Sequence, residues 1–143
     1  MECNIRWLGK ETMSFVAESG SGHSFVMDTS TDGGGRNLGP RPMETVLSGA
    51  IACTVYDVLS YLKSEGQKVE GCKAITKAQR SSMHPKVFIK IHIHFVIDGI
   101  NVKEKYVKKA IDLSKSTYGS GYKMLSLSAE IEDTFEVNNQ MKN

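Results

Sequence analysis

The stretch that decides the fold spans residues 39–66 and reads GPRPMETVLSGAIACTVYDVLSYLKSEG. Proline suits the first turn of a helix, where its missing N–H costs nothing, so we predict a long helix from near Pro42 to near Gly66. A broad, mostly apolar stripe recurs at helical spacing; it consists of Val46, Leu47, Ala50, Ile51, Thr54, Val55, Val58, Leu59 and Leu62. Because the first half is apolar almost all round, we expect a helix buried against more than one partner.

The segments on both sides of this helix have the pattern of strands. Three short strands are predicted before it, in residues 4–9, 13–19 and 23–29, with a glycine-containing turn at 19–23. The residues after it, 72–80 and 87–97, alternate with a period of two. A second helix is predicted over 103–116, and a last alternating strand over 127–137. This order indicates an α+β fold with antiparallel sheets, in one domain of residues 1–143 with a frayed tail at 138–143.

The composition of the chain argues against some classes of binding partner, namely nucleic acids and membranes. The chain has 143 residues and a net charge of +2, from 18 basic and 16 acidic residues. No basic stripe with interleaved aromatic residues is present, so nucleic-acid binding is not expected. No uninterrupted apolar run approaches the ~18 residues of a membrane span, and no secretory signal is recognised at the start. Three cysteines in such a chain favour free thiols in a reducing cytoplasm.

Two motifs are weak candidates for ligand binding. His92 and His94 lie two apart on one strand face, a spacing that some metal sites use, but no nearby carboxylate completes a set. We interpret them as polar residues on the less apolar face of the sheet, and no metal or cofactor is predicted. The glycine-rich stretch DGGGRNLG at residues 32–39 lacks the lysine and the spacing of phosphate-binding loops. Backbone flexibility explains it better, and its three consecutive glycines argue against a regular element.

Cys53 is the remaining candidate for chemistry. A cysteine reacts as its thiolate and needs a positive neighbour or a helper base. The helix N-terminus is too distant to help, because the dipole effect fades within a turn. Arg36 and Arg41 flank the start of the helix, and either could bring a positive charge to its small-residue face. Spacing and composition alone favour a packing role for Cys53 over a nucleophilic one.

Several segments of the chain together resemble the OsmC/Ohr family, the osmotically inducible and organic-hydroperoxide-resistance proteins, and most closely its YhfA-like branch. The similar segments are SGHSFVMD, GPRPMETVLSGAIACTVYDVLSYL, HPKVFIKIHIHF, AIDLSKSTY and the closing alternating strand. The resemblance implies an OsmC-like fold, in which an intertwined homodimer wraps strands around two central helices. It also implies a thiol peroxidase, in which a helix cysteine attacks the O–O bond of a hydroperoxide.

Carried onto this sequence, the resemblance makes Cys53 the attacking cysteine. The family's glutamate corresponds to Glu44, one position later than usual, and its arginine to Arg36 or Arg41. The second, resolving cysteine of the family follows a tyrosine, and here Gly119 follows Tyr118.

Cys72 of the same subunit is not expected to replace the missing resolving cysteine. The helix from Cys53 to Gly66 spans about 20 Å, and a disulfide needs Cα atoms within ~7 Å, so Cys72 is not expected to reach Cys53. The prediction is therefore a one-cysteine, hydroperoxide-reducing protein of oxidative-stress defence that depends on an external thiol. The alternative is a non-catalytic homologue that binds a small apolar or electrophilic ligand at the dimer-interface pocket.

Overall fold

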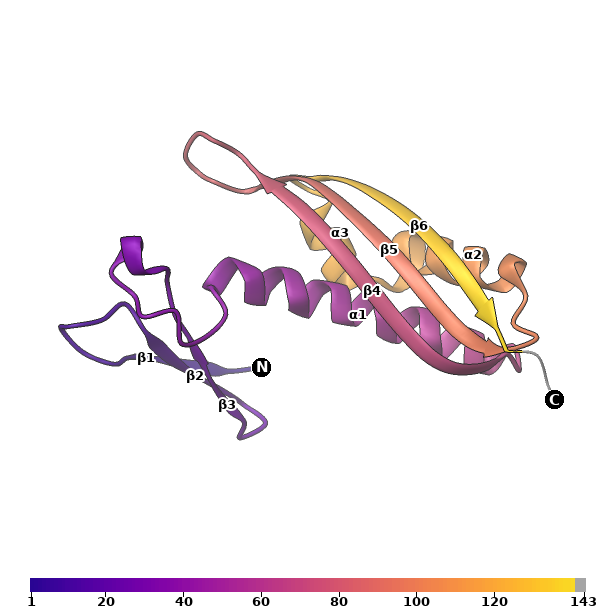
Figure 1. Cartoon of the computed structure of the whole chain (residues 1–143), viewed down its shortest axis with the longest axis horizontal. Coiled ribbons are helices and arrows are strands. Elements are labelled where there is room, and N and C mark those ends of the chain that lie inside the picture. Colours follow the sequence, from indigo (N-terminus) through magenta and orange to yellow (C-terminus); the bar gives the residue numbers. More distant parts are fainter. Residues whose placement is uncertain (141–143) are drawn as a thin grey trace. The chain divides into compact units, whose positions relative to one another are not determined.

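The computed structural model describes residues 1–140 and divides the chain into two compact units, Met1–Ser48 and Gly49–Asn143 (Figure 1). The longest helix, α1 (Pro42–Ser64), begins in the first unit and continues into the second. The prediction that all residues form one domain stays a prediction.

The first unit is a small antiparallel sheet. Its strands β1 (Cys3–Trp7), β2 (Phe15–Ser19) and β3 (Ser24–Met27) are paired in chain order. The predicted turn between the last two is confirmed: the N–H of Gly22 donates to the Ser19 carbonyl at 2.9 Å, and Gly22 has φ +84°, a conformation that glycine adopts without strain. Only Ala17 and Met27 are buried apolar residues here, so the apolar core of this unit is small.

The glycine-rich loop of the first unit wraps around one carboxylate. Asp28 is fully buried and accepts hydrogen bonds from the N–H groups of Thr29 (2.8 Å), Arg36 (3.0 Å) and Leu38 (3.0 Å), and from the Ser14 hydroxyl (2.9 Å). A Cβ at position 35 would lie 2.6 Å from the Asp28 carboxylate, so only glycine lets the backbone come this close. The expectation of no regular element was wrong in one detail, because residues Thr31–Gly33 form a short 3₁₀ turn, η1.

The second unit contains a three-stranded sheet with helices against it. Its strands are β4 (Lys68–Arg80), β5 (Phe88–Ile100) and β6 (Glu130–Asn139), in that order. Between the last two strands come α2 (Glu104–Leu113), a π-helical turn η2 (Ser114–Tyr118) and α3 (Ser120–Leu125). Figure 1 shows α2 and α3 on one side of this sheet.

The α+β class is confirmed, but the expectation of purely antiparallel sheets was wrong. Strands β4 and β5 are antiparallel, whereas β6 pairs with β5 in parallel, with Phe95 opposite Phe135. The physical reason is the long helical connection between β5 and β6, because a crossover returns the chain to the end where β5 began. The tail was also misjudged: residues 138 and 139 belong to β6, and Gln140 donates its N–H to Gly99 at 2.9 Å. Residues 141–143 lie outside the described part.

One face of the sheet and one stripe of each helix form the core of the second unit. Along β5 every second residue from Ile91 to Ile97 is buried, as the period of two predicted. The buried apolar side chains of this unit include Val58, Leu62, Ile91, Ile93, Phe95, Ile97, Val107, Ala110 and Ile111. The opposite face of β5 carries Lys90, His92 and His94, which are only partly covered or exposed.

Helix α1 has the predicted limits, and its burial against more than one partner stays a prediction. Past its C-terminus Gly66 adopts φ +66°, and the N–H of Gln67 returns to the Leu62 carbonyl at 2.9 Å, a glycine-dependent helix end. Within the single chain only Ile51, Thr54, Val58 and Leu62 of α1 are buried. By length and composition α1 is also apolar enough to cross a membrane, a test that core helices of soluble proteins pass too.

Candidate functional site

Cys53 lies on the side of α1 away from its buried stripe. The stripe residues Ile51, Thr54 and Val58 follow helical spacing, and at about 100° per residue Cys53 falls on another side of the helix. In the described chain the Cys53 side chain is exposed. Within the single chain α1 packs through the stripe of Ile51, Thr54 and Val58, and the interpretation of Cys53 as a packing residue stays a prediction.

An open pocket of about 440 Å³ adjoins this thiol. Its residues from α1 occupy positions 52, 53, 56 and 57, and the segment around η2 and α3 adds two more; the full lining is Ala52, Cys53, Tyr56, Asp57, Tyr118 and Ser120. Both tyrosines are exposed. The structure thus brings Cys53 together with the two neighbours of Gly119, the position that the resemblance assigns to a second cysteine.

A close contact between α3 and α1 lies next to this pocket, one residue after Ser120. A Cβ built on Gly121 would lie only 2.7 Å from the Ala50 Cα and 2.8 Å from the Ala50 carbonyl oxygen. Real Cβ atoms essentially never approach so closely, so α3 can lie on α1 here only because residue 121 is glycine. This contact holds Tyr118 and Ser120 beside the pocket.

The local backbone also requires a glycine at position 119. Its N–H donates to the Ser114 carbonyl at 2.7 Å, which closes the π-helical turn η2. A Cβ at this position would clash with that same carbonyl oxygen and come within 3.1 Å of the Tyr122 Cβ. A cysteine at residue 119 would therefore need a different turn. The missing resolving cysteine is accompanied by a local backbone that excludes any side chain there.

Asp57 is the charged residue of the pocket. The fully buried Ser114 donates its hydroxyl to Asp57 Oδ2 at 3.0 Å. No lysine or arginine is among the pocket's lining residues, so the described part of the chain supplies no positive charge there. A thiolate is stabilised by such a charge, and in this pocket the thiol has a carboxylate as its neighbour instead.

The charge of Lys115, in the segment that ends at Tyr118, is compensated by an acidic residue. Lys115 in η2 forms an ion pair with Asp133 in β6. Burial opposes the charged form of Lys115, but the hydrogen bond and the charge of Asp133 outweigh it and raise the pKa of the ammonium group. Burial also raises the pKa of the adjacent Tyr122 hydroxyl, against the opposing effect of Lys115. Lys115 is thus held within the second unit by the sheet.

Two of the predicted site residues, Arg41 and Glu44, are brought together at the start of α1. Glu44 Oε2 accepts a hydrogen bond from the Arg41 N–H at 3.0 Å, and the guanidinium lies 3.9 Å from Glu44 Oε1. This is one half of a capping box, in which the third helical residue satisfies the free N–H before the helix. Helix capping therefore accounts for both residues in the first unit.

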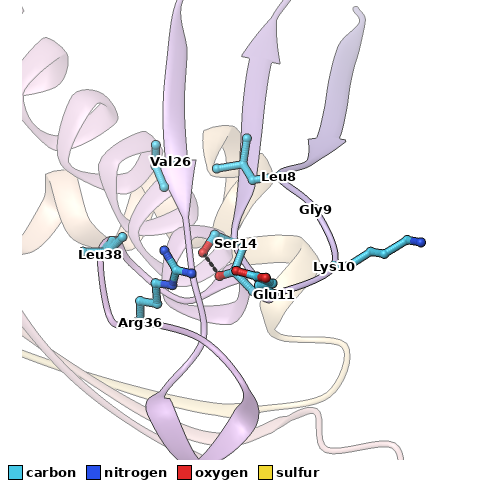
Figure 2. Close-up of a pocket in the computed structure, with 9 residues that line it drawn as sticks. Leu8, Gly9, Lys10, Glu11, Ser14, Val26, Arg36 and Leu38 are labelled. Carbon is cyan, nitrogen blue, oxygen red and sulfur yellow. Dashed lines mark hydrogen bonds between the residues drawn. The ribbon is translucent and has the colours of Figure 1, made fainter.

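Arg36 lines a different pocket in the first unit. Figure 2 shows its side chain turned toward a hollow, while Lys10 points away. The hollow measures about 510 Å³ and is lined by Leu8, Gly9, Lys10, Glu11, Thr12, Ser14, Val26, Arg36 and Leu38. The Arg36 backbone is held by Asp28 at 3.0 Å.

The other candidates have ordinary surroundings. His92 Nε2 and His94 Nδ1 both bond the Thr134 hydroxyl, at 3.1 and 2.8 Å, and the described residues contain no group of three or more potential metal ligands. Cys72 is half-buried, and burial followed by the charge of Asp98 raises the pKa of its thiol. Cys72 is therefore a poor nucleophile.

Sequence reasoning missed part of the pocket. The position of Asp57, four residues after Cys53, could have been found, because residues four apart share a helix face. Ser120 and the buried Ser114 gave no such signal, since their relation to Cys53 depends on how α3 packs on α1.

Comparisons with known proteins agree on one family. The family model described as OsmC-like protein matches residues 33–132. Protein YhfA of Escherichia coli (strain K12) is 34% identical over 137 residues, covering 96% of this chain and 98% of that protein. A solved structure of a hypothetical protein from Aquifex aeolicus VF5 is similar with a TM-score of 0.84 and 27% identity, over 98% and 97% of the two chains.

A more distant likeness concerns the fold alone. The organic hydroperoxide resistance protein OsmC from Legionella pneumophila has a TM-score of 0.67 at 16% identity, and the match covers 95% of this chain and 96% of that one.

Proposed function

Because the chain belongs to the OsmC-like family, we propose that it reduces organic hydroperoxides and hydrogen peroxide in oxidative-stress defence, with Cys53 as the attacking thiol. The observation that carries the proposal is the exposed Cys53 in a pocket lined on its other side by the neighbours of Gly119. Organic hydroperoxide resistance proteins among the structural neighbours support it through the shared fold.

The proposed reaction needs only one thiol of the protein, together with two external thiols. Cys53 attacks the terminal peroxide oxygen, the O–O bond breaks, and the products are an alcohol or water and a Cys53 sulfenic acid. With no side chain at residue 119, an external thiol forms a mixed disulfide with Cys53 and releases water. A second external thiol then restores the Cys53 thiol. The pairing of Cys53 with Arg36, Arg41 or Glu44 stays a prediction.

We also propose that the protein works as a homodimer in the cytoplasm. Both units leave large apolar side chains exposed, among them Ile5, Trp7, Phe25 and Val46 in the first and Tyr56, Ile75 and Ile89 in the second. A second copy of the chain would cover such surfaces. The expected mass in solution is twice the 15.8 kDa of one chain, which light scattering after gel filtration measures; a monomer at micromolar concentration would contradict it.

The test of the peroxidase is the rate of Cys53 oxidation. Protein mass is followed after mixing with cumene hydroperoxide or hydrogen peroxide, with and without a sulfenic-acid trap, for the native chain and Cys53→Ser. We expect trapping on Cys53 at least 100-fold faster than on a free cysteine, and none at that position in the variant. Cys72→Ser is the matched control and should react like the native chain. Oxidation no faster than that of a free thiol would refute the proposal.

One observation favours the alternative, a non-catalytic protein that binds a small apolar or electrophilic ligand. The Cys53 pocket contains two tyrosines and a carboxylate but no cation among its described residues, whereas a reactive thiol calls for one. The oxidation experiment separates the two, because a binding protein would leave Cys53 no more reactive than a free thiol.

A further inference from the structure

We propose that His92 and His94 form a two-imidazole chelate for a divalent transition-metal ion, on the face of the second unit's sheet that lies opposite its core. The ion belongs to the class that prefers imidazole nitrogen, such as Zn²⁺, Ni²⁺ or Cu²⁺. The described residues contain no group of three or more potential metal ligands, so the site uses two protein ligands and leaves the other positions of the ion to water. The proposal does not depend on the hydroperoxide chemistry of Cys53.

The two ring nitrogens already converge on one atom. His92 and His94 stand two residues apart on β5, so their side chains share a face of the sheet. His92 Nε2 and His94 Nδ1 lie 3.1 and 2.8 Å from the same oxygen, that of the Thr134 hydroxyl. An ion with two bonds of about 2.0–2.1 Å needs these nitrogens about 3–4 Å apart. Small turns of the two partly covered rings, away from Thr134 and toward the ion, meet this requirement.

A carboxylate on β6 favours the form of His94 that binds a metal. Glu136 Oε2 lies 3.8 Å from His94 Nε2, the ring nitrogen that does not face Thr134. A negative charge there favours the proton on Nε2, which leaves Nδ1 bare on the side of His92. Metal-binding histidines are commonly oriented by a carboxylate at their other nitrogen. No carboxylate completes the pair in the local sequence; the parallel pairing of β6 with β5 supplies it.

The pair is open on the side of β6. Both histidines contact β6 through Thr134, and the side chains of His94 and Glu136 are 30% and 53% exposed. Ile75, one of the apolar residues that a second copy would cover, lies opposite His94 on β4. Because β4 and β6 flank β5 on opposite sides, a second copy placed over Ile75 would approach from the β4 side, and an ion can enter from the β6 side.

The charges around the pair also favour entry from the β6 side. Lys77 lies opposite His92 on β4 and repels a cation from that side. Lys90, two residues before His92, is compensated by Glu132 on β6, with its Nζ 3.6 Å from the carboxylate. Glu136 adds a further negative charge on β6. A divalent cation is therefore attracted to the strand on which the two imidazoles already converge.

The experiment is isothermal titration of the full chain with Ni²⁺, Zn²⁺ and Mg²⁺. The chain carries Cys3→Ser, Cys53→Ser and Cys72→Ser, so that no thiol takes the metal. We expect one Ni²⁺ or Zn²⁺ per chain and no Mg²⁺, which prefers oxygen ligands. The electron paramagnetic resonance spectrum of bound Cu²⁺ should show coupling to two imidazole nitrogens.

His92→Gln and His94→Gln should each weaken Ni²⁺ binding by about 100-fold, because the second nitrogen of a chelate acts at high effective concentration. His23→Gln and His84→Gln remove the other two histidines of the chain, and as matched controls they should bind Ni²⁺ as tightly as before. Zn²⁺ should also raise the melting temperature of the starting protein and of both controls, but not that of the first two variants. Ni²⁺ binding that survives in His92→Gln or His94→Gln overturns the inference.

Glu136 is tested as a positioning residue. Glu136→Gln should weaken Ni²⁺ binding by about tenfold, as the loss of such an orienting carboxylate does. Glu130→Gln removes the same charge elsewhere on β6 and should leave the affinity unchanged, whereas equal losses in the two variants would refute the orienting role. The titration uses no hydroperoxide and a chain without Cys53, so the metal site and the proposed peroxidase can fail independently.

Discussion

Gly121→Val is expected to lower the free energy of unfolding by about 1–3 kcal/mol or more, the range for forcing atoms into a packed contact. The new Cβ would lie 2.7 Å from the Ala50 Cα and 2.8 Å from its carbonyl oxygen. Both are backbone atoms of α1, so no side-chain rotation relieves the overlap. Helix α3 has to move, and the wall of the Cys53 pocket moves with it.

Urea unfolding at one fixed protein concentration measures this effect, because the midpoint falls while the slope stays constant if only stability changes. Lys123→Val is the matched control, since it introduces the same side chain at an exposed position of α3 and should cost only about 0.5 kcal/mol in helix propensity. Equal midpoints for the two variants would show that the close approach of α3 to α1 does not exist in solution.

The second large effect is expected at Asp28. Hydrogen bonds, first from the Leu38 N–H and then from its other donors, hold the pKa of this buried carboxyl at about 2, below its ordinary 3.8. A carboxyl with a lowered folded-state pKa stabilises the fold fully above the unfolded-state value. That stabilisation is lost as the pH falls from about 4 to about 2, where the folded protein also becomes protonated.

Asp28→Asn should therefore lower the melting temperature by several degrees at pH 7 and make the loss of stability below pH 4 less steep. Each carboxylate oxygen accepts two of the four hydrogen bonds, so an amide NH₂ would face two donors in either orientation. The fluorescence of Trp7, the single tryptophan, reports on the sheet of the first unit. Glu18→Gln, at an exposed site of β2, is the control; matching acid profiles for both variants would refute the role of Asp28.

Much of the fold could be predicted because local rules act within short segments. Proline at the start of α1 and glycine past its end determine the helix limits, and the alternation in β5 identifies its buried face. The parallel pairing of β6 was missed, since strand direction depends on the route of the connection. Within the single chain α1 buries one stripe, and composition does not reveal how much of a helix one chain covers.

The candidate site was likewise predictable from the sequence only in part. Cys53 and the glycine after Tyr118 were identified from the sequence and its resemblance to the OsmC/Ohr family. Asp57 and Ser120 were not, although Asp57 could have been inferred from its helical spacing. The reason that residue 119 is glycine could not be found from the sequence pattern, because the clash arises only when a π-helical turn brings the carbonyl of Ser114 close to this position.

By itself, the sequence determined the α+β class, the helix limits and the cysteine on α1, because propensity, capping and periodicity act over a few residues. Only the tertiary structure decided that Cys53 is exposed beside Asp57, that Gly121 lets α3 lie on Ala50, and that Gly119 excludes a side chain. The contact of Gly121 with Ala50 and the position of Ser120 beside Cys53 depend on the approach of segments about seventy residues apart, and steric exclusion between such segments exists only after the chain has packed.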